Sequence, residues 1–137
     1  MANFIYNKAK ESMLSGLINL STKKIRTLLI NNSLYTPNIN SDQHVSQIPA
    51  SAIKKRSGDL QNVVFSLGVI DADDLIISDH DGSAFNSIVG YQVGTSDSDS
   101  ILLFYIDTAT GLPFTGSSSA LPVTILWDNG ANKIIAL

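Results

Sequence analysis

Short apolar runs separated by turn residues fill the second half of the chain, and the spacing of these runs constrains the fold most strongly. Runs of this length match β-strands, whereas helical patterns need ten or more residues. The runs lie at Asn62–Leu67, Leu75–Ile77, Phe85–Val93, Ile101–Ile106, Val123–Trp127 and Lys133–Leu137. Because βαβ units would need helices between the strands, the spacing predicts a mainly β fold: an antiparallel β-sandwich or jelly-roll-like domain. Ile101–Ile106 is apolar at every position, which is typical of a central strand covered on both faces.

The last two runs carry a strong hairpin signal. Val123–Trp127 and Lys133–Leu137 flank a segment that contains Asn129-Gly130. Asn-Gly favours a tight turn because both residues tolerate positive φ. We therefore expect the two runs to pair with each other as the closing element of the sheet. Trp127, at the edge of this hairpin, packs either in the core or against a partner.

The N-terminal segment 3–16 has the clearest helical pattern. Apolar residues recur at four-residue spacing from Ile5 to Met13, Asn3 is a candidate N-cap, and Gly16 stands where a left-handed C-cap belongs. A helix with one thin apolar stripe must dock on its own sheet or on a neighbour. We expect it to reach out as an arm, with a β domain that folds without it.

Residues 17–137 are predicted to form that β domain, so the chain reads as a single domain, 1–137. Leu17–Leu20 and Lys24–Ile30 are further strand candidates. The long segment 31–58 is predicted to be an ordered loop, which either packs on a partner surface or folds over its own sheet.

Composition excludes several functions. The chain has 137 residues and no cysteine, so disulfides and thiolate chemistry are excluded. No run approaches the ~18 apolar residues of a membrane-spanning helix, and the N-terminus lacks the apolar stretch of a secretory signal. We therefore expect no membrane partner.

Charge is distributed unevenly along the chain. Up to Arg56 there are eight Lys and Arg residues against two acidic ones, a net +6. Beyond it one Lys faces ten Asp, a net −9. The basic residues are scattered along the N-terminal half, and its aromatic residues do not alternate with them. This pattern argues against a nucleic-acid-binding protein. Complementary protein surfaces are the better interpretation, either on a partner or between copies.

The side chains offer little chemistry. Five aspartates lie between Asp71 and Asp81, but the calcium-loop pattern fails at Asp79-His80-Asp81-Gly82, where the glycine comes too early and no glutamate follows. Solvated turns are the simpler interpretation. The sequence has no nucleophile elbow and no paired carboxylates in a buried setting. We expect neither enzymatic activity nor a cofactor nor a metal.

Three segments together resemble a known family. They are residues 1–11 (MANFIYNKAKE), 105–113 (YIDTATGLP) and 127–134 (WDNGANKI). The chain is similar to small virion proteins of tailed bacteriophages and prophages. The resemblance spans nearly the whole chain, is weakest over residues 38–60, and includes no catalytic motif.

The resemblance implies a capsid decoration, or cement, protein. Such a protein, made in the bacterial cytoplasm, would bind the outer surface of the head lattice, with the major capsid protein and neighbouring copies of itself, as a dimer or trimer, as partners. A tail, head-fibre or head-to-tail structural protein is the alternative, and a calcium-stabilised carbohydrate-binding module is one of another class. The candidate partner contacts are Phe4, Lys8, Lys10, Lys54, Lys55 and Arg56.

Overall fold

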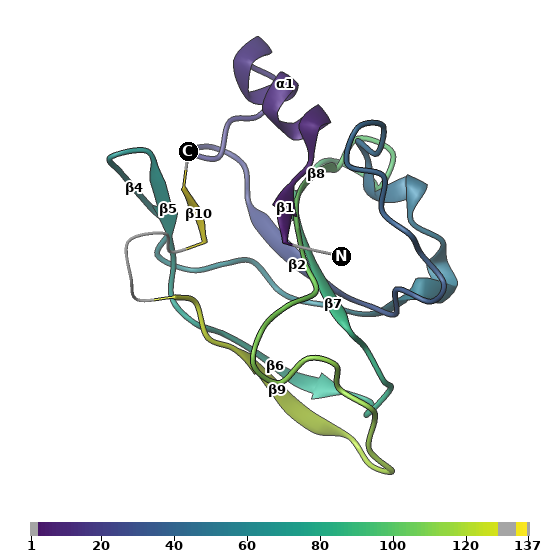
Figure 1. Ribbon diagram of the computed structural model, residues 1–137. Coiled ribbons are helices and arrows are strands. Elements are labelled where there is room, and N and C mark those ends of the chain that lie inside the picture. The colour runs from purple at the N-terminus through teal and green to yellow at the C-terminus, as the bar shows by residue number, and fades with distance from the viewer. Residues whose placement is uncertain (1–2, 129–133, 137) are drawn as a thin grey trace.

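A five-stranded antiparallel sheet forms the centre of the computed structural model, which describes residues 3–128 and 134–136 (Figure 1). In spatial order its strands are β1 (Phe4–Ile5), β8 (Ile101–Ile106), β7 (Ser87–Gln92), β2 (Ile25–Ile30) and β3 (Ile53–Arg56). Every described pairing in it is antiparallel. The all-apolar run 101–106 is an interior strand, buried at five of its six positions, as predicted.

Two smaller antiparallel sheets complete the β structure (Figure 1). One has the order β10 (Ile135–Ala136), β5 (Val69–Asp71), β4 (Val64–Ser66), and the other pairs β6 (Leu75–His80) with β9 (Leu121–Ile125). The one α-helix of the described residues, α1 (Asn7–Ser15), follows β1, and two 3₁₀ turns, η1 (Val45–Gln47) and η2 (Ala50–Ala52), precede β3. The predicted mainly β, antiparallel fold with one N-terminal helix is confirmed.

The predicted C-terminal hairpin is wrong. β9 pairs with β6, with Ile125 opposite Leu75, whereas β10 pairs with β5, with Ile135 opposite Ile70. The Asn129-Gly130 turn lies outside the described residues. A local turn signal therefore did not decide the strand partners, because strand pairing depends on cross-strand neighbours that lie far away in the sequence.

The N-terminal helix begins four residues later than predicted. Phe4 and Ile5 form β1, opposite Tyr105 and Phe104 of β8. Asn3 is not a helix cap: its amide donates to the carbonyl of Thr108, and its Oδ1 accepts from the backbone N–H groups of Asp107 and Thr108, all at 3.0 Å. Gly16 adopts the left-handed C-cap as predicted, with φ 83°.

The N-terminal segment is part of the core and not an arm. Tyr6, Ala9 and Ser12 are buried, and the backbone N–H of Tyr6 donates to the carbonyl of Leu103 at 3.0 Å. The reach-out interpretation therefore fails for this stretch. Leu17–Leu20, predicted as a strand, is irregular.

The long segment 31–58 folds over its own sheet, which decides between the two alternatives. Tyr35, Val45 and Ile48 are buried with Tyr105 in one cluster. The Tyr35 hydroxyl donates to Asp42 at 2.7 Å and lies 3.0 Å from the Tyr6 hydroxyl, so the loop is fastened to the N-terminal segment. The end of the segment is also not loop, because Ile53–Arg56 is strand β3.

A β-bulge in β8 divides the side chains of this strand between two hydrophobic clusters. Gly90 of β7 faces Phe104, but the next residue, Tyr91, faces Leu102, so Leu103 is the extra residue. Leu103 and Phe104 consequently belong to one hydrophobic cluster, while Leu102 belongs to the other. Without the bulge, neighbouring side chains would alternate between the faces.

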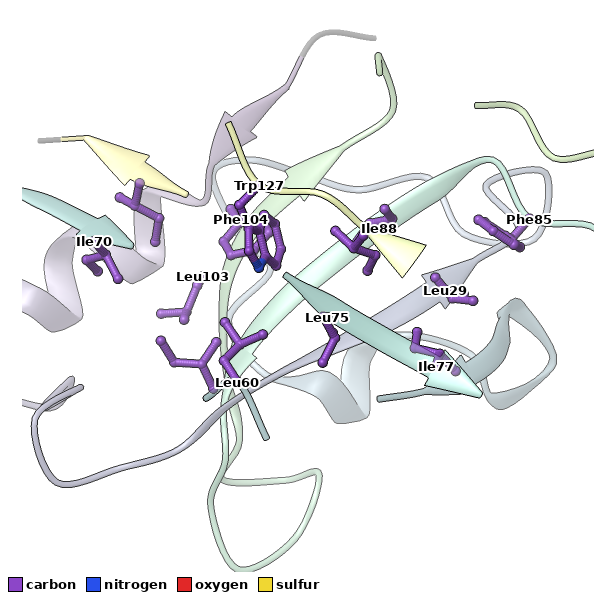
Figure 2. Packing of buried hydrophobic residues seen from close by; sticks show 13 residues of the cluster. Leu29, Leu60, Ile70, Leu75, Ile77, Phe85, Ile88, Leu103, Phe104 and Trp127 are labelled. Atoms are coloured by element: carbon purple, nitrogen blue, oxygen red, sulfur yellow. The ribbon is translucent and has the colours of Figure 1, made fainter. Parts of the chain in front are cut away.

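Trp127 is a core residue, which decides the question that the sequence left open. It is 6% exposed and meets the Phe104 ring edge-on, with ring centroids 6.2 Å apart (Figure 2). Its backbone N–H donates to the Asp74 carboxylate at 2.9 Å. The Phe104 ring in turn lies over Gly90, where a Cβ atom would overlap it.

We predict that Trp127→Ala lowers the free energy of unfolding by about 3–5 kcal/mol, because it removes a buried aromatic ring and leaves a cavity. Leu126→Ala is the matched control: Leu126 is exposed, so its truncation costs no more than about 0.5 kcal/mol. Urea unfolding measures both. Equal small losses would contradict the buried position of Trp127.

We predict that deletion of residues 2–15 abolishes cooperative folding, because it removes β1 and the buried Tyr6 from the edge of β8. Amide dispersion in a two-dimensional NMR spectrum measures the result, and Lys10→Ala, an exposed change on α1, serves as the control. A well-dispersed spectrum of the deletion variant would restore the arm interpretation.

Candidate interaction surface

The candidate contacts near the N-terminus are held by the chain itself. The Phe4 ring stacks on Tyr105 and meets Tyr6 edge-on, with centroids 5.2 Å apart in both pairs. Lys8 forms an ion pair with Glu11 at 2.9 Å, one turn along α1, while Lys10 is exposed. Phe4 is thus a packing residue, and Lys8 and Lys10 are helix-surface charges.

The basic triplet Lys54-Lys55-Arg56 lies on β3, at the opposite edge of the large sheet from β1. The structure does not bring it together with the N-terminal candidates. Lys55 pairs with Asp79 at 3.0 Å, and Arg56 holds both carboxylate oxygens of Asp97, at 2.9 and 2.6 Å.

The uneven charge along the chain is therefore partly matched within the fold. Besides the two pairs on β3, Arg26 contacts Asp59 at 2.6 Å. Each pair joins a cation of the basic half to an aspartate of the acidic half. Basic and acidic halves of one sequence can therefore form ion pairs with each other in the fold, without a partner protein.

The aspartates between residues 71 and 81 serve local structure. Asp73 accepts a hydrogen bond from Asn62 and Asp74 accepts one from the backbone of Trp127. The Lys55 ammonium lowers the pKa of Asp79, and hydrogen bonds from Ser83 lower the pKa of Asp81. Within residues 3–128 and 134–136, no three acidic or histidine side chains form a group that could hold a metal.

His80, which the sequence placed in a turn, is the last residue of β6 and is fully buried. Its Nε2 lies 2.7 Å from the Ser83 carbonyl oxygen, which can only accept, so Nε2 carries the proton. The ring packs edge-on against Phe85 and Phe114. Its Nδ1 has no hydrogen-bond partner among the described residues. The Nε2 contact with Ser83 ties His80 to the turn that follows β6.

The buried tyrosines are equally unsuited to acid–base chemistry. Burial raises the pKa of the Tyr6 hydroxyl, and burial also raises that of Tyr35, well above the ordinary tyrosine value. Both hydroxyls stay protonated at physiological pH and act as hydrogen-bond donors.

An apolar groove runs between the end of α1 and the β4–β5 hairpin. We call it the α1–β4 groove. It has a volume of about 250 Å³, and its walls are Met13, Ile18 and Leu20 on one side and Phe65, Ser66, Gly68, Val69 and Ile70 on the other. None of these side chains titrates.

Exposed apolar side chains lie on the segments that form this groove. Leu67, at the hairpin tip, is 98% exposed, and Leu14, at the end of α1, is 90% exposed. Leu17, Val64 and Phe65 are also half-exposed or more. The sequence reasoning missed this surface, because exposure depends on which strands pair. One signal was available: Leu14 lies off the apolar stripe of the helix.

A second cleft, of about 400 Å³, lies between the turn 109–112 and the segment 123–126. Phe85 and Ile88 complete its walls, and again no lining side chain titrates. A third, of about 220 Å³, adjoins the α1–β4 groove and shares Leu20 and Phe65 with it. The α1–β4 groove is the strongest candidate for an interaction site, since it combines an apolar lining with exposed apolar surroundings.

Neither a scan against protein-family models nor a search of curated proteins finds a match for this chain. Within the described part of the chain, no helix has the length and apolar character needed to cross a bilayer.

We predict that Arg56→Gln lowers the free energy of unfolding by no more than about 1 kcal/mol, and that added salt shrinks this loss, because the Arg56–Asp97 pair is partly exposed. Lys54→Gln is the matched control on the same strand, since the structure gives Lys54 no ion pair within the described residues. Urea unfolding at low and high salt measures both variants. Equal losses would show that the pair with Asp97 contributes nothing.

Proposed function

We propose that the chain is a non-enzymatic structural protein of a tailed-bacteriophage particle, which binds the outer surface of the head lattice as a decoration protein. The observation that carries this proposal is the α1–β4 groove with its exposed apolar surroundings. A patch of this kind on a single chain is typical of a protein–protein contact. The groove and the 400 Å³ cleft offer a ligand no titratable side chain.

The capsid as partner comes from the resemblance of the three segments to phage virion proteins. In the fold, described residues from each of these segments meet around β8. β1 pairs with β8, the Asn3 side chain is bonded to the turn that follows β8, and Trp127 packs on Phe104 of β8. The resembling residues therefore maintain the fold, which is what a rigid lattice module without a reactive site requires.

A decoration protein works by repetition. Each copy needs only modest contacts, because neighbours on a lattice hold one another at high effective concentration. The exposed apolar side chains around the groove supply such a contact without any bound cofactor.

The number of copies per particle tests the proposal. We expect quantitative mass spectrometry of purified particles, with labelled peptides of this chain and of the major capsid protein, to give a fixed ratio that corresponds to scores or hundreds of copies. A tail protein measured in the same sample calibrates the low-copy range. A handful of copies would overturn the head-lattice role and favour the tail, head-fibre or head-to-tail alternative.

A further inference from the structure

Strand β4 is a sheet edge without the usual protection. Edge strands normally carry charges or proline, which prevent pairing with another chain. Among the described edge strands of three or more residues, β3 carries Lys54-Lys55-Arg56, β6 carries Asp79 and β9 carries Pro122. β4, Val64-Phe65-Ser66, carries neither, and it lies at the margin of the molecule (Figure 1).

The open edge of β4 presents one hydrogen-bonding residue. Leu67 and Gly68, at φ 52° and 78°, form the two-residue turn of the β4–β5 hairpin. Such a turn closes on a hydrogen-bonded pair, here Ser66 and Val69, and the antiparallel ladder then alternates. The N–H and C=O of Phe65 consequently point away from β5, toward the open edge.

Each face of this edge carries one exposed apolar side chain. Neighbouring strand residues point to opposite faces, so Val64 and Phe65 lie on different sides of the hairpin. Val64 is 54% exposed and Phe65 is 50% exposed. An occupant of the groove alone would cover only the Phe65 side. A strand that lies along β4 covers both side chains and uses the free backbone groups as well.

Strand β4 itself is uncharged, as are residues 12–22 (SMLSGLINLST) and 60–70 (LQNVVFSLGVI). Charges lie further out: Asp71 of β5 stands opposite Val64, and Lys23 and Lys24 line the third cleft, which Phe65 borders. In a twofold contact residue i meets residue j and j meets i. With Phe65 on the axis, Val64 of one copy stands opposite Ser66 of the other, so no like charges meet along β4 and the strand is complementary to itself.

We propose that β4 pairs antiparallel with β4 of a second copy about a twofold axis, which names the first partner of the surface that the proposed function rests on. The two Phe65 residues face each other and exchange both backbone hydrogen bonds. Two three-stranded sheets thereby become one six-stranded sheet, with the two Phe65 residues at its centre.

Apolar side chains are available on both sides of the edge. Leu14, Leu17, Val64, Phe65 and Leu67 are each at least half-exposed. They supply the apolar part of the contact. The remainder is polar in an ordinary interface, and the neighbouring serine and asparagine side chains provide it.

Sedimentation velocity of the purified full-length chain over a range of concentrations tests the inference. The wild type is expected to sediment as a dimer at high concentration. Val64→Lys puts a charge on the paired edge, opposite Ser66 of the copy and diagonal to the copy's own substituted residue, and is expected to weaken the dimer at least about tenfold. Ile76→Lys is the matched control: Ile76 is an equally exposed strand residue, at 66%, but lies on β6.

A second variant guards against misfolding of the first. Leu67→Asn removes the exposed side chain at the tip and gives the turn its favoured Asn-Gly sequence, so it keeps the hairpin and is expected to weaken the dimer several-fold. In hydrogen exchange, the Phe65 amide of the wild type is expected to become more protected as concentration rises.

Three results would overturn the pairing: a wild-type monomer at every concentration, a trimer or larger closed ring, or a dimer that neither Val64→Lys nor Leu67→Asn weakens. A monomer that instead protects Phe65 only when capsid protein is added would assign the edge to a capsid strand. The copy number per particle is measured in a separate experiment. A low copy number would overturn the head-lattice role without affecting the sedimentation result. A monomer in sedimentation would overturn the pairing of β4 without affecting the copy number.

Discussion

The packing of the Phe104 ring over Gly90 is the contact on which the rest of the structure depends. A side chain at position 90 would push the ring out, because its Cβ would occupy the space of the ring. Since the bulge at Leu103 turns Phe104 to the same face as Leu103, both residues form the floor on which the smaller sheets pack. Trp127 then closes against the ring (Figure 2). One glycine, one extra residue and one indole thus join three sheets.

The class of fold could be predicted from the sequence because short apolar runs and turn residues are local signals. The strand Ile101–Ile106 was also predictable, since a strand buried on both faces has an apolar residue at every position. The partners of strands are not local. The C-terminal runs illustrate this, because their distant partners β6 and β5 outweighed a strong turn signal between them. The β1 strand was hidden for a similar reason, since Asn3 binds the turn after β8 and does not cap the helix.

The candidate site divides in the same way. The basic triplet was visible in the sequence, but its pairing with Asp79 and Asp97 depends on how β3, β6 and the loop after β7 come together. The α1–β4 groove is made from two uncharged segments about fifty residues apart. Each segment alone is typical of core, so only the fold reveals that their side chains remain exposed. Basic residues that pair with aspartates of the same chain, and apolar side chains that stay exposed, favour contacts made by shape and backbone pairing.

The placement of the first strand beside β8 has a consequence for how the protein is made. Asn3 has to find the backbone of Thr108, 105 positions further along the chain. A chain that emerges from the ribosome N-terminus first therefore leaves Phe4 and Tyr6 without their partners on β8 until residues 101–108 have been translated. Such non-local pairings form slowly. The five-stranded sheet cannot close on β1 before then.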